Sequence, residues 1–81
     1  MTVRVVAFAR VREILGESDI ALMLAEPARV SDAWSTLAGR APALDALHAS
    51  TRVARNGRLC AYDEPLADGD ELALLPPSGG G

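Results

Sequence analysis

Two strongly apolar segments at opposite ends of the chain constrain its fold more than any other feature. Residues 2–9 read TVRVVAFA and predict a β-strand whose apolar side chains fall on both faces, Val3, Val5 and Ala7 on one and Val6 and Phe8 on the other. Residues 71–76 read ELALLP and predict a second apolar strand, which ends where two prolines cannot donate ladder hydrogen bonds. We therefore expect the first and last strands to lie side by side in the middle of a mixed sheet.

The segments after the first strand predict alternating helix and strand. Residues 10–16, RVREILG, predict a short helix closed by Gly16, and residues 19–25 predict a half-buried strand that stops before Pro27. The main helix is expected to begin with Ser31 as its N-cap, with Asp32 at the positive end of the helix dipole. Its apolar stripe includes Trp34, which is expected in the core.

The second half of the chain predicts a short helical stretch and a hairpin. Pro42 can start a helical stretch over residues 42–49, and Asn56-Gly57 is the dipeptide most typical of a type I′ turn between two strands. A loop is expected around Pro65 and the DGD sequence of residues 68–70. This order of elements, with the main helix laid across one face of the sheet, predicts an α+β roll of the β-grasp kind.

Size and composition exclude several classes of function. The chain has 81 residues, enough for one small core but not for a deep active-site cleft. Its net charge is -3 and its eight basic residues are spread along the chain, which argues against nucleic acid. No apolar stretch is long enough to span a membrane. A single cysteine, Cys60, rules out an internal disulfide, and we expect a cytoplasmic protein.

No group of side chains in the sequence predicts a conventional active site. His48 has no partner at metal-ligand spacing and is expected on the surface, so we expect no metal site. Cys60 is expected to be a small strand residue, and Ser35 and Ser50 have no base nearby. The acidic residues near the last strand are expected in a solvated turn rather than a calcium loop; they are Asp63, Glu64, Asp68, Asp70 and Glu71.

The glycine-rich end, residues 78–81, is either a frayed end, a cloning remnant or the working part of the protein. Pro76 and Pro77 stiffen its root, and glycines can enter a channel too narrow for other residues. Its carboxylate becomes an electrophile once it is joined to a leaving group such as AMP. All eight basic residues are arginines, so the chain offers no lysine amine for an isopeptide bond.

Three motifs together resemble the small subunits of molybdopterin synthase, a family of ubiquitin-like sulfur carriers. They are FARVREILG from Phe8 to Gly16, PLADGDELALLPP from Pro65 to Pro77, and the closing diglycine. The resemblance covers nearly the whole chain and implies a ubiquitin-like β-grasp domain over residues 1–77 with a flexible functional tail over residues 78–81.

The resemblance implies sulfur carriage through the tail. Gly81 would be adenylated by an ubiquitin-activating-like enzyme that uses ATP, and would then become a thiocarboxylate; no cofactor would be held tightly by the chain itself. Gly80 would pass the narrowest part of the channel in the large subunit of the synthase. There the sulfur would be donated to cyclic pyranopterin monophosphate to build the molybdenum cofactor. The small subunit would thus take part in a transferase complex, two copies of each subunit, with no catalytic side chain of its own.

The resemblance also implies an apolar partner-docking face on the side of the sheet away from the helix. The residues that match it position by position are Phe8, Leu59 and Leu75, and Pro76, Pro77 and Gly79 are expected to contact the partner along the tail. For Phe8, a plain core position is the alternative. Arg55 is expected to be a surface strand residue, with contact to a partner as the alternative, and Ser78 stands where the family often has an apolar residue.

Two other functions stay open at this point. A sibling carrier for thiamine thiazole or another sulfur metabolite would use the same tail chemistry, although thiazole carriers tend to lack the FARVREILG segment. A non-catalytic β-grasp interaction module would have an incidental glycine end. Binding of an activating enzyme separates the carriers from the module.

Overall fold

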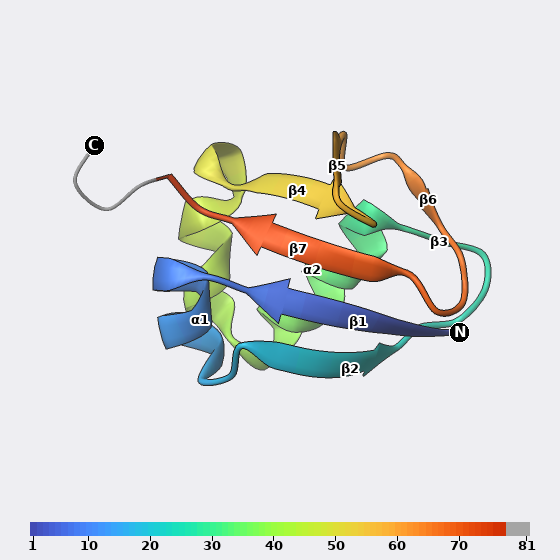
Figure 1. The fold of residues 1–81 in the computed structure, drawn as a ribbon. Coiled ribbons are helices and arrows are strands. Elements are labelled where there is room, and N and C mark those ends of the chain that lie inside the picture. Colours follow the sequence, from blue (N-terminus) through green and yellow to red (C-terminus); the bar gives the residue numbers. More distant parts are fainter. Residues whose placement is uncertain (78–81) are drawn as a thin grey trace.

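A five-stranded mixed sheet forms the body of the protein in a computed structural model, which describes residues 1–77. Along the chain the five strands are β1 (Thr2–Ala7), β2 (Asp19–Met23), β4 (Arg52–Arg55), β5 (Arg58–Cys60) and β7 (Glu71–Leu75). Their order across the sheet is β2-β1-β7-β4-β5 (Figure 1). The expectations for residues 78–81 lie outside the described residues.

The first and last strands lie side by side, as predicted. β1 and β7 pair in parallel, with Val5 opposite Leu72 and Ala7 opposite Leu74, while the other pairs of the sheet are antiparallel. In Figure 1 the two strands run together through the middle of the sheet. Each therefore has a neighbouring strand on both sides, so that its backbone N–H and C=O groups are paired along both edges.

The helices cover one face of the sheet. α1 (Ala9–Leu15) follows β1 directly and α2 (Val30–Arg40) crosses behind the strands in Figure 1. Gly16 ends α1 in the left-handed conformation, with φ 79°, as the sequence predicted. The core lies between the helices and the sheet, and its largest fully buried side chains are Leu22, Leu37, Leu44, Leu72 and Leu74. Trp34 is 3% exposed, so its predicted core position is confirmed.

The main helix begins earlier than predicted, because tertiary contacts satisfy its first N–H groups. Arg29, and not Ser31, is the N-cap residue. Asp32 accepts a hydrogen bond from the Arg29 N–H at 2.7 Å, while the N–H groups of Val30 and Ser31 donate to the carbonyls of Glu64 and Tyr62. Donors that would be orphaned at a helix start thus find partners more than thirty residues away.

The segment that follows Tyr62 and Glu64 was predicted as a loop. Residues Pro65–Leu66 form a short strand, β6, paired antiparallel with β3 (Ala28–Arg29) in a separate two-stranded sheet. Two-residue strands have no periodicity to detect, so the prediction of a plain loop around Pro65 was wrong.

The remaining connections agree with the sequence analysis. The stretch after Pro42 is a 3₁₀ helix, η1 (Pro42–Ser50). Asn56 and Gly57 join β4 to β5 with φ values of 49° and 84°, and positive φ at both positions is the mark of a type I′ turn. Within residues 1–77 we find no helix that is both long and apolar enough to cross a membrane.

Candidate partner-binding surface

A row of small and apolar residues crosses the sheet on the face opposite the helices. The strand registers align Val6 with Ala73, Ala73 with Ala54, and Ala54 with Leu59. These positions alternate with the core residues of the same strands, so they point to the other side of the pleat. Ala54 is 7% exposed although it takes no part in the helix-side core, so its neighbours on the outer face cover it.

Phe8 and Leu75 extend this row at one end of the two central strands. The last aligned pair of β1 and β7 is Ala7 with Leu74, so Phe8 and Leu75 occupy the next position on each strand. The backbone of Phe8 is still extended, with φ -124° and ψ 155°, and the side chain continues the outer-face alternation. Phe8 is 45% exposed, which overturns the alternative that it is a plain core residue.

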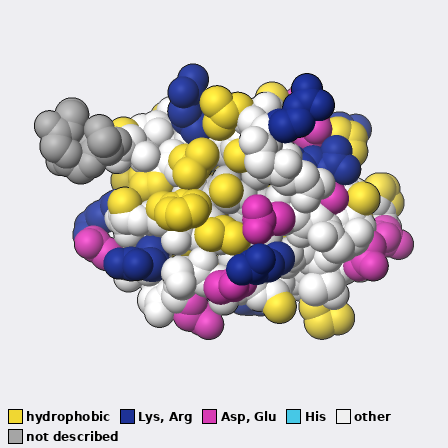
Figure 2. All heavy atoms as spheres, viewed as in Figure 1, with side chains coloured by type: hydrophobic (Ala, Val, Ile, Leu, Met, Phe, Trp, Pro, Cys, Tyr) yellow, Lys and Arg dark blue, Asp and Glu magenta, His cyan; other side chains and the backbone are white. Residues whose placement is uncertain are grey.

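Leu59 closes the row on β5, the strand at the edge of the sheet. It is 59% exposed, one of three large hydrophobic side chains that the described part of the chain leaves open to solvent. We call the whole surface the outer patch: Val6, Phe8, Ala54, Leu59, Ala73 and Leu75. Figure 2 shows apolar side chains gathered over the middle of this face.

Three members of the outer patch were not singled out from the sequence. Val6, Ala54 and Ala73 carry small or branched side chains and have no motif of their own. The signal for Val6 and Ala73 was the alternation with Phe8 and Leu75, which lie two residues further along the chain. The sheet register was needed to bring Ala54 and Leu59 beside them.

Charged side chains border the outer patch on its β2 side. The Arg4 guanidinium contacts Asp19 at 2.6 Å and Glu71 at 3.4 Å. The hydrogen bond from Arg4 holds the pKa of Asp19 below its usual range. Both side chains are more than half exposed, so the pair is screened by water and contributes little to stability. At this border of the outer patch, Asp19 and Glu71 neutralise the charge of Arg4.

The root of the tail lies next to the outer patch. Leu75 is the last residue of β7, Pro76 is half-buried and Pro77 is exposed. The chain therefore leaves the sheet from the strand that carries Ala73 and Leu75. The predicted roles of Gly79, Gly80 and Gly81, and the remark on Ser78, concern residues outside the described part.

Asp70 is not in a solvated turn, which corrects the reading of the acidic residues. It is 7% exposed and accepts hydrogen bonds from Arg55 Nε at 2.7 Å, Asn56 Nδ2 at 2.9 Å and the Ala67 N–H at 2.7 Å. Burial opposes ionisation of Asp70, but these hydrogen bonds outweigh it and lower the pKa. Asp70 thereby ties the β4–β5 turn to the start of β7.

Arg55 is likewise not a simple surface strand residue. It lies opposite Leu72 on β7, on the helix side of the sheet, and is half-buried. Its guanidinium pairs with Asp70 and, at 3.3 Å, with Glu64. Arg55 thus links the β4–β5 hairpin to Asp70 and Glu64. The sequence around Arg55 gave no local signal for these two partners.

The remaining candidate residues lie apart from the outer patch. His48 is exposed, as predicted, with its ring 4.4 Å from that of Tyr62. Burial raises the pKa of the Cys60 thiol, which agrees with a strand residue that is not an activated nucleophile. Ser35 and Ser50 are exposed. In residues 1–77, no three possible metal-ligating side chains gather in one place.

Comparison with known proteins identifies the family. The model of the ThiS family matches residues 5–81. The small archaeal modifier protein 1 of Haloferax volcanii is 38% identical over 82 residues, covering 91% of this chain and 94% of that protein. The molybdopterin synthase sulfur carrier subunit of Chlamydomonas reinhardtii is 32% identical, and the match covers both proteins completely.

Similar solved structures identify the fold. The crystal structure of the Haloferax volcanii modifier superposes with a TM-score of 0.88 at 35% identity, over the full length of both chains. A putative molybdopterin converting factor subunit 1 from Pyrococcus furiosus superposes with a TM-score of 0.86 at 32% identity, covering 95% of this chain and 98% of that one. The fold is the ubiquitin-like β-grasp, and the chain belongs to the ThiS family of sulfur carriers.

Proposed function

We propose that this protein carries sulfur for molybdenum cofactor synthesis, on the terminal carboxylate of Gly81. The supporting observation is the outer patch, an apolar surface on the open face of the sheet that adjoins the root of the tail at Leu75 and Pro76. The match to the ThiS family runs through residue 81 and so includes the glycines. A relative that aligns over its full length is a molybdopterin synthase sulfur carrier subunit.

The proposed chemistry takes place at the tail. The Gly81 carboxylate attacks the α-phosphorus of ATP on an activating enzyme, which forms an acyl-adenylate and releases pyrophosphate. A sulfur nucleophile supplied by a donor then displaces AMP, and the product is a thiocarboxylate. In the large subunit of the synthase the thiocarboxylate sulfur bonds to cyclic pyranopterin monophosphate, and water then cleaves the acyl–sulfur bond, which leaves the sulfur on the pterin and regenerates the Gly81 carboxylate. No side chain of this protein takes part in these steps, and ATP is bound by the activating enzyme alone.

The outer patch is the proposed docking surface for the large subunit and the activating enzyme. Large apolar side chains that are open to solvent gain most from being covered by a partner, and Phe8 and Leu59 are 45% and 59% exposed. Docking on this face would leave Pro76, Pro77 and the glycines Gly79 and Gly80 free to extend from β7 into the partner's site.

The intact mass of the protein purified from its own host tests the proposal. The expected result is a species heavier by one oxygen-to-sulfur exchange, with the change mapped to the peptide that ends in Gly81. If only the unmodified mass appears, the protein is incubated with ATP, the activating enzyme and a sulfur donor. No exchange after that treatment would contradict sulfur carriage.

A second candidate function is protein modification, because the Haloferax volcanii relative at 38% identity is a small archaeal modifier protein. The same activated Gly81 would then be attacked by a lysine of a target protein. This chain has no lysine, so it would act as donor only and would not form side-chain-linked chains of itself.

Two measurements separate these candidates. Restoration of molybdenum-enzyme activity in a host that lacks the small subunit supports the carrier for molybdopterin. Lysine residues in other proteins that carry the C-terminal glycine remnant of this chain support the modifier. A sulfur-loaded protein that does neither would point to a carrier for another sulfur metabolite.

A further inference from the structure

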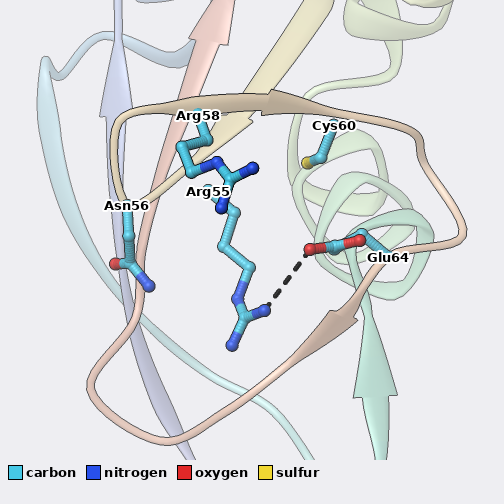
Figure 3. A pocket seen from close by; sticks show the side chains of 5 residues that line it. All are labelled: Arg55, Asn56, Arg58, Cys60 and Glu64. Carbon is cyan, nitrogen blue, oxygen red and sulfur yellow. Dashed lines mark hydrogen bonds and ion pairs between the residues drawn. The ribbon is translucent and has the colours of Figure 1, made fainter.

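A cavity of about 330 Å³ lies beneath the β4–β5 hairpin, away from the outer patch. It is lined by Arg55, Asn56, Arg58, Cys60 and Glu64, and we call it the hairpin pocket (Figure 3). Leu59 points to the outer face, so its neighbours Arg58 and Cys60 on β5 point to the opposite side, where Arg55 also lies. The pocket is therefore separate from the surface proposed for docking.

Two positively charged side chains, Arg55 and Arg58, line the hairpin pocket. Arg55 and Arg58 are directly opposite each other in the antiparallel register of β4 and β5. Like charges at directly opposite positions of a sheet destabilise it. Figure 3 shows both side chains directed into the pocket. Such an arrangement is relieved when an anion binds between the two guanidinium groups.

The two arginines differ in how well they are neutralised. Arg55 is held by a strong hydrogen bond from its Nε to Asp70 at 2.7 Å, which leaves its outer N–H groups directed at the pocket. Arg58 is exposed and makes no ion pair with any residue between 1 and 77. Asp70 balances one of the two charges, so the charge of Arg58 remains available to a ligand.

Glu64 supplies the carboxylate in the lining of the pocket. Its contact with Arg55 Nη1 is 3.3 Å, longer than a strong charge-assisted hydrogen bond, and 39% of its side chain is exposed. A ligand anion can therefore take its place on Arg55 without disturbing Asp70. The Cys60 thiol, whose pKa burial raises, adds no negative charge to the wall at neutral pH.

We propose that the hairpin pocket binds a small oxyanion of the phosphate or carboxylate class between Arg55 and Arg58, with Glu64 as the internal group that the ligand displaces. The volume is at the lower end for small-molecule sites, which suits a single phosphate or carboxylate and the small group that carries it. The planar, fixed fork of a guanidinium matches both kinds of anion. The inference does not rest on the proposed function of the tail.

The test is a titration of the full ¹⁵N-labelled chain, followed by NMR at constant ionic strength. Inorganic phosphate is used in one arm and succinate in the other. We expect saturable shifts in the backbone amides of residues 55–60 and in the guanidinium signals of Arg55 and Arg58. Tighter binding of phosphate or of succinate tells which anion class the pocket prefers, and either supports the proposal.

Three variants make the assignment specific. Arg58→Gln is expected to weaken binding by about tenfold or more, because one charge-assisted hydrogen bond is lost. Glu64→Gln is expected to tighten it, since the competing carboxylate is gone. Arg40→Gln, which removes an exposed arginine at the end of α2, is the matched control and should leave binding unchanged.

Two outcomes would overturn the proposal. The first is the absence of saturable shifts at the hairpin with both anions. The second is an equal loss of affinity in Arg58→Gln and Arg40→Gln, which would reveal a general charge effect. Urea unfolding of Arg58→Gln accompanies the titration, and we expect its stability to equal or exceed that of the parent because the like-charge pair is removed.

Discussion

Substitution of Leu59 by alanine tests the outer patch at its most exposed member. Complete burial of a leucine side chain is worth about 1.5–3 kcal/mol. Leu59 is 59% exposed, so a partner that covers this exposed part of the side chain gains about 1–2 kcal/mol of binding free energy. Leu59→Ala should therefore weaken binding to the synthase large subunit by about 5- to 30-fold.

The measurement is isothermal titration of the large subunit with the parent and variant chains. Met23→Ala is the matched control, because Met23 is 77% exposed yet lies opposite Thr2, at the end of β1 remote from Phe8. Fluorescence of the single tryptophan, Trp34, which is buried, follows unfolding in urea and checks that each variant keeps its stability. We expect Met23→Ala to bind like the parent.

Two results would refute the reasoning about the outer patch. Unchanged affinity of Leu59→Ala would show that the partner does not cover this end of the row. An equal loss in Met23→Ala would show that binding depends on exposed apolar area anywhere on the sheet and not on this surface.

Further predictions concern the Phe8 end of the patch, the tail and the hairpin. Phe8→Arg should abolish binding to the large subunit with the fold intact, because Phe8 is partly exposed; loss of the cooperative urea transition would contradict this. Deletion of Gly81 should leave stability unchanged but stop ATP–pyrophosphate exchange by the activating enzyme, and exchange that persisted would rule out the terminal-acyl mechanism. Asp70→Asn should lower stability at neutral pH by about 1–3 kcal/mol, since hydrogen bonds to a buried carboxylate are weakened. The folded-state pKa of Asp70 is lowered, so its contribution is present above the unfolded value of about 3.9 and is lost as pH falls further; urea unfolding between neutral pH and pH 2 should show the two proteins converging. Gly57→Ala should cost about 1–2 kcal/mol in the same unfolding assay from its φ of 84° alone, because nothing lies within 4 Å of an added Cβ.

Local patterns were sufficient for most of the elements. Apolar alternation identified β1 and β7, Gly16 marked the end of α1, and Asn56-Gly57 marked the hairpin turn. Each of these signals acts within a few residues, through backbone conformation or side-chain period, and so is visible without the fold. The same alternation placed Phe8 on the other face from Val3 and Val5, and the burial of those two residues shows that Phe8 lies opposite the core.

Features that depend on distant partners were missed or misjudged. Ser31 looked like a better cap than Arg29, but the carbonyls of Glu64 and Tyr62 moved the start of α2. The pairing of β3 with β6 left no pattern in either segment. Asp70 looked solvated because acidic residues in a Gly-containing turn usually are.

By itself, the sequence determined the strands of the five-stranded sheet, the alternation of side chains along β1 and β7, and the glycines of residues 79–81. Only the tertiary structure decided which positions on those strands meet. Val6, Ala73, Ala54 and Leu59 come from four strands, and a shift of one residue in any register would send one of them to the other face. Register is set by packing the whole core against the helices, and for that reason both the outer patch and the Arg55–Arg58 pair appear only in the folded protein.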